Sequence, residues 1–270
     1  MTDGRSAPPA PEQYYDALTD VYLRLFGHDW HLGYWVDASD LAHAATRLNE
    51  VMLRRLPQTP GLAILDVGCG AGGGSVFIAT RRDCSIVGVS NSRSGLDEAT
   101  RYAAAHNVAD RVRFEFADAV ALPFPDASFD AIWSAEAIHN ITDMDALCAQ
   151  FARVLKPGGT IVAGDVFALG DPASSTLAQM TSFGLHVLTA DQWIAQFSRH
   201  GIRVVESISI GHHVGPSFDA CTAICRTALT GTDLSPVARV ILTRTIDALA
   251  AMKAAFEARE LSWGIWVGTR

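Results

Sequence analysis

Short runs of apolar residues alternate with helical patterns along most of the chain after Gly61. Uninterrupted apolar strands that are separated by helices are typical of a parallel sheet covered on both faces. Five such runs occur, at residues 63–67, 85–89, 112–116, 131–133 and 160–166. Two further strands are predicted at 203–209 and 262–267, and Pro157-Gly158-Gly159 predicts a tight turn into the fifth strand.

Helical periodicity marks both the beginning and the later part of the chain. It predicts a helix from residue 12 and a second helix to Leu56, with Ser39 or Asp40 as its N-cap. Within residues 213–260 one apolar stripe recurs at helical spacing: Ala238, Ile241, Leu242, Thr245, Leu249 and Met252. This late segment is either a packed helical pair or a lid over a substrate, and the pattern alone fits both.

These patterns divide the chain into three parts. The polar, Pro/Ala-rich residues 1–11 are predicted to be a flexible tail, and residues 12–60 an N-terminal helical cap. Residues 61–270 then form one α/β domain with a helical lid insertion at about 213–260.

Composition narrows the function further. The chain is 49% hydrophobic and 19% charged, with a formal net charge of −8, so it can bury a full core but should repel nucleic-acid phosphates. No apolar run is long enough to span a bilayer. The five cysteines are scattered and odd in number, which favours reduced thiols in a cytoplasmic protein. A small-molecule substrate fits best, and a homo-oligomer stays among the options.

The strongest chemical signal is the glycine-rich segment 64–74, which follows the first strand and opens a helix. Gly68, Gly70 and Gly72 let the backbone approach a ligand closely, and the helix start offers free N–H groups. Asp66 precedes them at the strand end, where a carboxylate suits a cationic ligand and repels a pyrophosphate. The glycine register also differs from the G-x-G-x-x-G fingerprint of dinucleotide enzymes. A plain strand-to-helix turn is the alternative reading.

This segment resembles motif I of class I S-adenosylmethionine (SAM) dependent methyltransferases. Segments 116–119, 122–130 and 153–159 resemble further family blocks in the family's order. His31-Leu32-Gly33-Tyr34-Trp35 and the late insertion resemble the small-molecule branch, which includes sugar O-methyltransferases of the rebeccamycin type. The resemblance implies a doubly wound, Rossmann-like, seven-stranded and mostly parallel sheet with an antiparallel last strand. SAM would lie across the carboxyl ends of the strands.

The resemblance also implies roles for individual residues. Asp118 would accept a hydrogen bond from the adenine amine, and the Ala119 N–H would face the adenine ring. Ser90 stands where many relatives bind the ribose through an acid, and Gly95 where the branch often has Gln. Aromatic residues of the N-terminal part would cap the sulfonium. The expected cofactor-binding set is Tyr14, Tyr34, Asp66, Gly68, Cys69, Gly70, Gly72, Ser90, Asn91, Ser92, Asp118, Ala119 and Glu136.

Methyl transfer to a hydroxyl requires alignment and removal of a proton, and His suits that second task. His139 follows the fourth strand, where the family's sugar O-methyltransferases carry a candidate general base. Asn140 replaces the second His that they often have. Asp165, at the end of the fifth strand, would orient His139. His212, His213, Cys221 and Cys225 do not have the spacing of a common zinc site, so no metal is expected.

The leading hypothesis is O-methylation of a natural product or glycosylated metabolite. N- or C-methylation of a small metabolite on the same fold is the first alternative. An NAD(P)-dependent oxidoreductase is opposed by the glycine spacing and by the missing Tyr-x-x-x-Lys pair. A SAM-binding protein without catalysis is a third. The Asn/Asp-Pro-Pro-Tyr segment of nucleobase methyltransferases is absent after the fourth strand.

Overall fold

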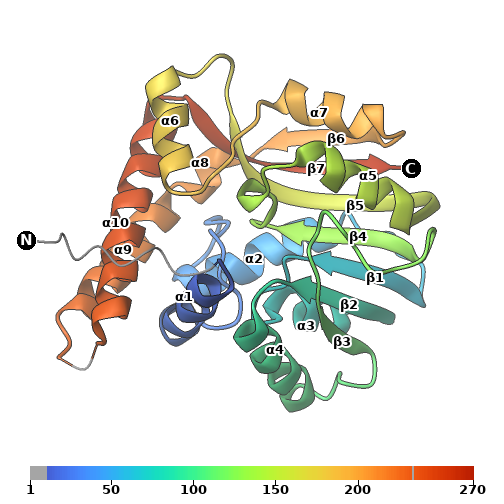
Figure 1. Cartoon of the computed structure of the whole chain (residues 1–270), viewed down its shortest axis with the longest axis horizontal. Helices are drawn as coiled ribbons and strands as arrows, with labels where there is room; N and C mark the ends of the chain where they lie inside the picture. The colour runs from blue at the N-terminus through green and yellow to red at the C-terminus, as the bar shows by residue number, and fades with distance from the viewer. Residues whose placement is uncertain (1–10, 233) are drawn as a thin grey trace, which may run out of the picture.

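The computed structural model describes residues 11–232 and 234–270, and the side chains from residue 19 onwards except that of residue 233. The predicted tail and the side chain of Tyr14 therefore lie outside the described residues. The architecture is a seven-stranded sheet in the order β3-β2-β1-β4-β5-β7-β6 (Figure 1). All neighbouring strands are parallel except that β7 runs antiparallel to both β5 and β6. This confirms the predicted fold class.

The strands agree with the apolar runs to within a few residues at most ends. They are β1 (Leu62–Val67), β2 (Cys84–Ser90), β3 (Val112–Phe116), β4 (Phe129–Ala135), β5 (Leu155–Ala168), β6 (Arg203–Ser209) and β7 (Leu261–Thr269). The helices are α1 (Pro11–Phe26), α2 (Leu41–Leu53), α3 (Gly73–Ala79), α4 (Arg93–Ala105), η1 (Ile138–Asn140), α5 (Met144–Val154), α6 (Ser174–Ser182), α7 (Ala190–Arg199), α8 (Gly211–Val214), α9 (Pro216–Leu229) and α10 (Pro236–Glu257).

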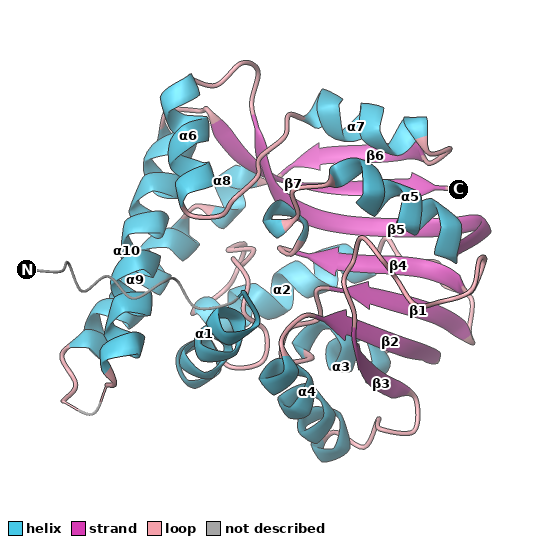
Figure 2. Cartoon of the chain, viewed as in Figure 1, coloured by secondary structure: helices cyan, strands magenta, loops and turns pink. Residues whose placement is uncertain are grey.

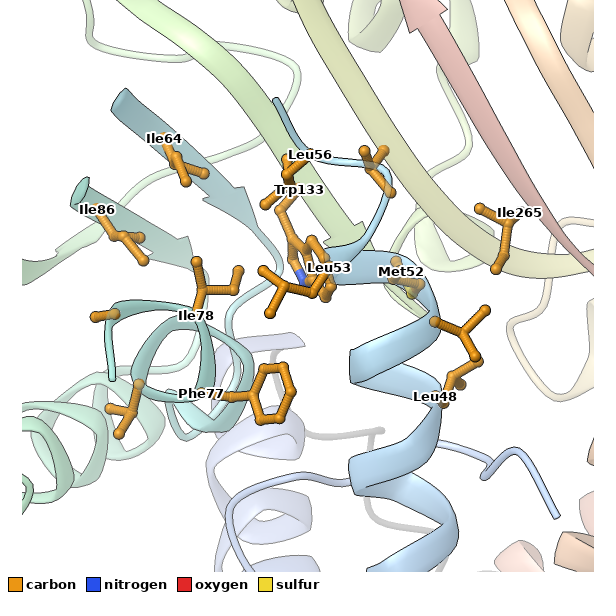
Figure 3. Packing of buried hydrophobic residues seen from close by; sticks show 14 of the residues in the cluster. Leu48, Met52, Leu53, Leu56, Ile64, Phe77, Ile78, Ile86, Trp133 and Ile265 are labelled. Atoms are coloured by element: carbon orange, nitrogen blue, oxygen red, sulfur yellow. The ribbon is translucent and has the colours of Figure 1, made fainter. Parts of the chain in front are cut away.

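Helices cover both faces of the sheet, because the strands are apolar on both sides. In Figure 2, α5 and α7 lie in front of the sheet, and α2 and α3 lie behind it. Figure 3 shows the core behind the sheet, where α2 and α3 pack against β1, β2, β4 and β7. Its labelled side chains are Leu48, Met52, Leu53, Leu56, Ile64, Phe77, Ile78, Ile86, Trp133 and Ile265. The rigid sheet fixes the positions of the loops at its carboxyl edge.

The remaining helices gather beyond that edge. Figure 1 shows α1, α9 and α10 past the arrowheads of β1, β2 and β4. The predicted stripe of α10 is buried from Ala238 to Leu249, and Met252 is half-buried. A hydrogen bond of 2.8 Å joins Tyr22 Oη of α1 to Thr245 Oγ1 of α10. The late helices are therefore packed on the N-terminal helix.

Two local predictions were wrong. The second helix ends at Leu53 rather than Leu56. Its N-cap is Asp40, one of the two predicted residues, whose side chain accepts the His43 N–H. Pro157–Gly159 is a bulge inside β5 rather than a turn before it. Pairing jumps from Phe129↔Leu155 to Ala131↔Thr160, so β5 accommodates extra residues. The Gly158 N–H, 2.9 Å from the Arg270 carbonyl, ties the bulge to the end of the chain.

Candidate active site

A cavity of about 280 Å³ lies at the carboxyl edge of the sheet, between the strand ends and the N-terminal segment. The ends of β1, β2 and β4 and the residues just after β3 form its floor. Of the predicted cofactor residues, those that line it are Asp66, Gly68, Cys69, Gly70, Ser90, Asn91, Ser92, Asp118, Ala119 and Glu136. The sheet thus brings together residues that lie as far apart in sequence as Asp66 and Glu136.

The glycine-rich loop follows β1 directly and needs glycine where it touches the β4 loop. Gly68 has φ = +79°, a backbone conformation that residues with a Cβ rarely adopt. A Cβ at Gly68 would also lie only 2.1 Å from the Cβ of Ala137. The loop therefore passes so close to the end of β4 that both of these segments border the same cavity.

Acidic side chains determine the electrostatics of the cavity. Asp29, Asp66, Asp118 and Glu136 line it, whereas no lysine or arginine of the described chain does. Burial raises the pKa of Asp66 to about 7, although the Ser75 hydroxyl donates to it at 2.6 Å, and the charge of Asp29 raises it further. Burial also raises the pKa of Glu136, against the opposing influence of His31 and the Leu32 N–H. A cationic ligand would stabilise these carboxylates, while a diphosphate would be repelled.

The residues predicted to contact adenine and ribose also line the cavity. Asp118 is exposed, and its Oδ1 accepts the Val120 N–H at 3.1 Å. Ser92 is buried and caps α4, because its Oγ accepts the Gly95 N–H at 3.1 Å. A Cβ at Gly95 would be 3.2 Å from the Gly70 carbonyl oxygen, so α4 starts against the glycine loop. This close approach leaves little room for the Gln that the family resemblance implies at this position.

The N-terminal segment forms the opposite wall. Thr19, Tyr22 and Leu23 line the cavity from one face of α1, and residues 27–31 continue the wall. His28 Nε2 lies 2.9 Å from Glu98 of α4, and its ring stacks on Tyr102. Thr19 Oγ1 lies 3.2 Å from Ser92 Oγ. These contacts hold the N-terminal segment against the sheet domain.

Glu136 connects three parts of the site. Its Oε1 accepts hydrogen bonds from the Leu32 N–H at 2.9 Å and from Trp263 Nε1 at 2.7 Å. Its backbone has φ = +51° and is held by a bond from its N–H to the Gly164 carbonyl. Such strain in a non-glycine residue persists where surrounding contacts enforce it. Glu136 therefore fixes the β4 loop relative to the N-terminal segment and β7.

His139 and Asp165 form a tight pair beside the cavity. His139 Nδ1 lies 2.6 Å from Asp165 Oδ1, and Asp165 is fully buried. Asp165 Oδ2 accepts the backbone N–H groups of Ile138 and His139, each at 3.0 Å. The carboxylate therefore sets the orientation of η1 and favours the tautomer that carries its proton on Nδ1 and a lone pair on Nε2.

The same pair tunes the basicity of His139. Burial lowers the pKa of its imidazole, but the charge and hydrogen bond of Asp165, together with Glu136, outweigh burial and raise this pKa above 6.5. His139 does not itself line the cavity, but its neighbours Ala137 and Asn140 do. The imidazole thus stands next to the cavity with a carboxylate behind it.

Two predicted cofactor residues are not in the cavity lining. Tyr34 follows Gly33, which packs closely against Ala44 of α2. The Tyr34 ring contacts the His213 ring, with centroids 4.6 Å apart. Gly72 sits under the loop as the N-cap of α3, against Ala99 and Phe114. Both pack against other parts of the chain in this structure, and their roles in cofactor binding stay predictions.

Other lining residues were not singled out from the sequence, chiefly Thr19, His28 and Asp29. The spacing of Thr19, Tyr22 and Leu23 on one helical face was a usable signal, but nothing marked that face as facing a ligand. His28 and Asp29 have no recognisable spacing. Within the described residues, no cluster of His, Cys, Asp and Glu could hold a metal ion. None of the described helices has the length and apolarity needed to cross a membrane.

The site residues fit SAM. The buried carboxylates suit its cationic amino group and sulfonium, the cavity borders a glycine loop, and Asp118 offers an acceptor for an adenine amine. The chemistry that bound SAM supplies is an electrophilic methyl group. The acidic lining opposes a dinucleotide with its diphosphate.

Comparisons with known proteins agree with this fit. A family model described as a methyltransferase domain matches residues 64–159. The chain is 34% identical over 219 residues to 27-O-demethylrifamycin SV methyltransferase of Amycolatopsis mediterranei, covering 78% of this chain and 80% of that protein. It is 34% identical over 209 residues to an O-methyltransferase of Pyrenophora dematioidea, covering 75% and 78%.

A solved structure adds evidence on the fold alone. The cyclase SpnF superposes with a TM-score of 0.84 at 23% identity, covering 98% of this chain and 99% of that one. The family match, the relatives and the geometry of the cavity lead to one assignment. This chain belongs to the class I SAM-dependent methyltransferases and is an enzyme whose methyl donor is SAM.

Proposed function

We propose that the protein transfers the methyl group of SAM to a hydroxyl of a small-molecule natural product or glycosylated metabolite. The observation that carries this proposal is the His139–Asp165 pair beside the cavity, with 2.6 Å between Nδ1 and Oδ1. A buried carboxylate behind an imidazole is the arrangement of a general base. The relatives named as O-methyltransferases support oxygen as the methylated atom.

The proposed role of His139 is to take the proton of the acceptor hydroxyl on Nε2 as the oxygen–carbon bond forms. Asp165 then stabilises the imidazolium and keeps the ring oriented. The leaving sulfur becomes neutral when its bond to the methyl carbon breaks, so no acid is needed to protonate it. The other demands are alignment and exclusion of water, which we assign to Glu136 and the N-terminal segment.

The cofactor contacts that we propose involve residues that line the cavity. Asp66, together with Asp29, would hold the cationic amino group, and Asp118 and Ala119 the adenine. Gly68, Cys69 and Gly70 would bring the backbone close to the ligand. Ser90, Asn91 and Ser92 would border the ribose. The N-terminal helices would act as a cap and residues 213–260 as a lid. We place the enzyme in the cytoplasm, acting on a small molecule rather than on nucleic acid.

The test is a screen of hydroxylated natural products with SAM, followed by His139→Ala on any acceptor found. We expect His139→Ala to reduce kcat by about two to four orders of magnitude, while the affinity for S-adenosylhomocysteine (SAH) stays the same. Asn140→Ala serves as a neighbouring control with a smaller loss. An undiminished rate in His139→Ala would instead favour an already nucleophilic nitrogen or carbon as the acceptor atom.

A further inference from the structure

A second cavity of about 260 Å³ lies behind the N-terminal segment, between α1, α2 and α9. Its apolar lining comes mainly from Leu25, Phe26, Leu41, Ala42, Ala45 and Ile224. It shares Asp29, Trp30 and His31 with the cofactor cavity, so these residues border both spaces. A dry apolar cavity of about 150 Å³ is enough to bind benzene, so this space can hold a substituted ring.

Two buried polar atoms on the shared wall lack hydrogen-bond partners among the described residues: Trp30 Nε1 and His31 Nε2. His31 is only 8% exposed. Its Nδ1 lies 2.8 Å from the Leu32 carbonyl oxygen, which can only accept, so Nδ1 carries a proton. In the neutral imidazole Nε2 then presents a lone pair, 3.9 Å from Asp29 Oδ1, which is beyond hydrogen-bond distance. Trp30 is held in place by stacking on Tyr22 with centroids 4.5 Å apart. The wall therefore offers one donor and one acceptor.

The acidic residues in this lining already accept hydrogen bonds from protein groups. Asp29 Oδ1 accepts from Asn49 Nδ2 at 3.0 Å. Asp40 caps α2 through the His43 N–H at 2.9 Å and accepts from the Ser39 hydroxyl. Each carboxylate is thus engaged within the protein. The rest of the lining is apolar, apart from the Trp30 Nε1 donor and the His31 Nε2 lone pair, which lack hydrogen-bond partners.

We infer that this cavity is a subsite for an uncharged, ring-sized apolar group of the methyl acceptor that carries a hydroxyl. A hydroxyl can accept from Trp30 Nε1 and donate to His31 Nε2, the two bonds that the protein leaves unmade. The inference rests on the proposed function. The Leu32 N–H binds Glu136, which lines the cofactor cavity, so the subsite adjoins the region of methyl transfer.

The test measures phenol and benzene binding by titration calorimetry to protein saturated with SAH, which keeps the probes out of the cofactor cavity. We expect saturable phenol binding that is tighter than that of benzene. Ile224→Phe fills the cavity and should weaken phenol binding at least tenfold, whereas Ala223→Phe, on the exposed neighbouring position of α9, should not. Ala42→Phe narrows the cavity from exposed Ala42 and replaces Ile224→Phe if that variant fails to fold.

Phenol should also inhibit methyl transfer competitively against the acceptor found by the screen, and this inhibition should be lost in Ile224→Phe. Equal phenol affinity in wild type and both cavity variants, or inhibition that is not competitive with the acceptor, would overturn the subsite. Failure of SAH to bind the wild type would overturn the proposed function instead. SAH binding without cavity-dependent phenol binding would overturn the subsite alone.

Discussion

Three carboxyl groups at the site differ in how hydrogen bonds from the protein stabilise their negative charge. Asp165 accepts three hydrogen bonds from the His139 segment and needs no ligand to stabilise it. Glu136 accepts two N–H bonds at one oxygen. Asp66 has the Ser75 hydroxyl and faces the charge of Asp29. The cofactor cavity therefore holds the carboxylates whose ionisation depends most on a bound cation.

Asp66 makes cofactor binding depend on pH. Burial raises its pKa to about 7 in the folded, ligand-free protein, above the usual 3.8. The folded state thus binds this proton more tightly than the unfolded state, and Asp66 reduces stability as pH rises from about 4 to about 7. A cationic ligand favours the carboxylate, so SAH affinity should rise by up to about tenfold per pH unit below about pH 7.

Calorimetric titration with SAH between pH 5.5 and 8.5 checks this expectation, with Asp66→Asn as the comparison. Asn keeps an acceptor for the Ser75 hydroxyl but cannot ionise, so its SAH affinity should be low and nearly independent of pH. Urea unfolding of the ligand-free variant should likewise lose the decline in stability toward pH 7. An unchanged pH dependence in Asp66→Asn would show that another group is responsible.

Asp165 should control the pH profile of the reaction. Burial lowers the pKa of His139, but Asp165 and Glu136 outweigh it and raise that pKa above 6.5. A general base must be neutral, so kcat should rise with pH through this raised pKa. Asp165→Asn removes the charge, so the rising limb should move to lower pH while the plateau falls about 10²- to 10⁴-fold. Rates across pH 5–9 measure both effects, and an unmoved limb would contradict the pairing.

At the level of elements, the sequence pattern predicted the strands and helices, which follow from periodic apolar residues. It did not predict the contacts in which two backbone segments approach each other closely. The apolar runs predicted the seven strands, and helical periodicity predicted the buried stripe of α10. The antiparallel direction of β7 was predicted from the family resemblance. The sequence predicted that Asp66, Gly68, Asp118 and Glu136 line the cofactor cavity, because recognisable motifs lie at the ends of their strands. Tyr34 lies outside the cavity lining, because its position follows from the contact of Gly33 with α2, which no local pattern reveals. Asp29 was not predicted as a lining residue, because no spacing in the sequence marks it.

That contact gives a prediction about how the N-terminal segment joins the sheet. A Cβ at Gly33 would lie 2.3 Å from Ala44 Cβ and 2.7 Å from Ala44 C in α2. Gly33→Ala should therefore push residues 31–35 away from α2, lower the free energy of unfolding by about 1–3 kcal/mol and weaken SAH binding. Urea unfolding and calorimetry measure the two effects.

Gly215→Ala is the matched control for Gly33→Ala. Its φ is −46°, and the nearest atom to an added Cβ is the Gly211 carbonyl oxygen at 3.7 Å. Removing a glycine from a helix start should leave stability unchanged or raise it slightly. Equal effects of the two substitutions would mean that the close approach at Gly33 does not constrain the segment.

For the whole molecule, the cofactor cavity lies between two parts that are joined by polar contacts. The sheet contributes the strand ends, and the segment from α1 to residue 31 contributes the opposite wall. Direct links between them include Thr19–Ser92 and His28–Glu98, and Leu32, next to the segment, binds Glu136. A ligand that fills the cavity contacts both parts and should stabilise the folded chain as a unit.

Thermal unfolding with SAH, SAM and NADH in parallel measures this stabilisation and separates the ligand classes. Ligand at a hundred times its Kd adds about 2.7 kcal/mol, provided that it does not bind the unfolded chain. For a chain of this size, that corresponds to a rise in Tm of roughly 5–10 °C. NADH should give no rise, because four acidic residues line the cavity and no described lysine or arginine does. If NADH raised Tm as much as SAH, the acidic lining would not be selecting the ligand. In that case Asp29 and Asp66 would not contact the bound ligand.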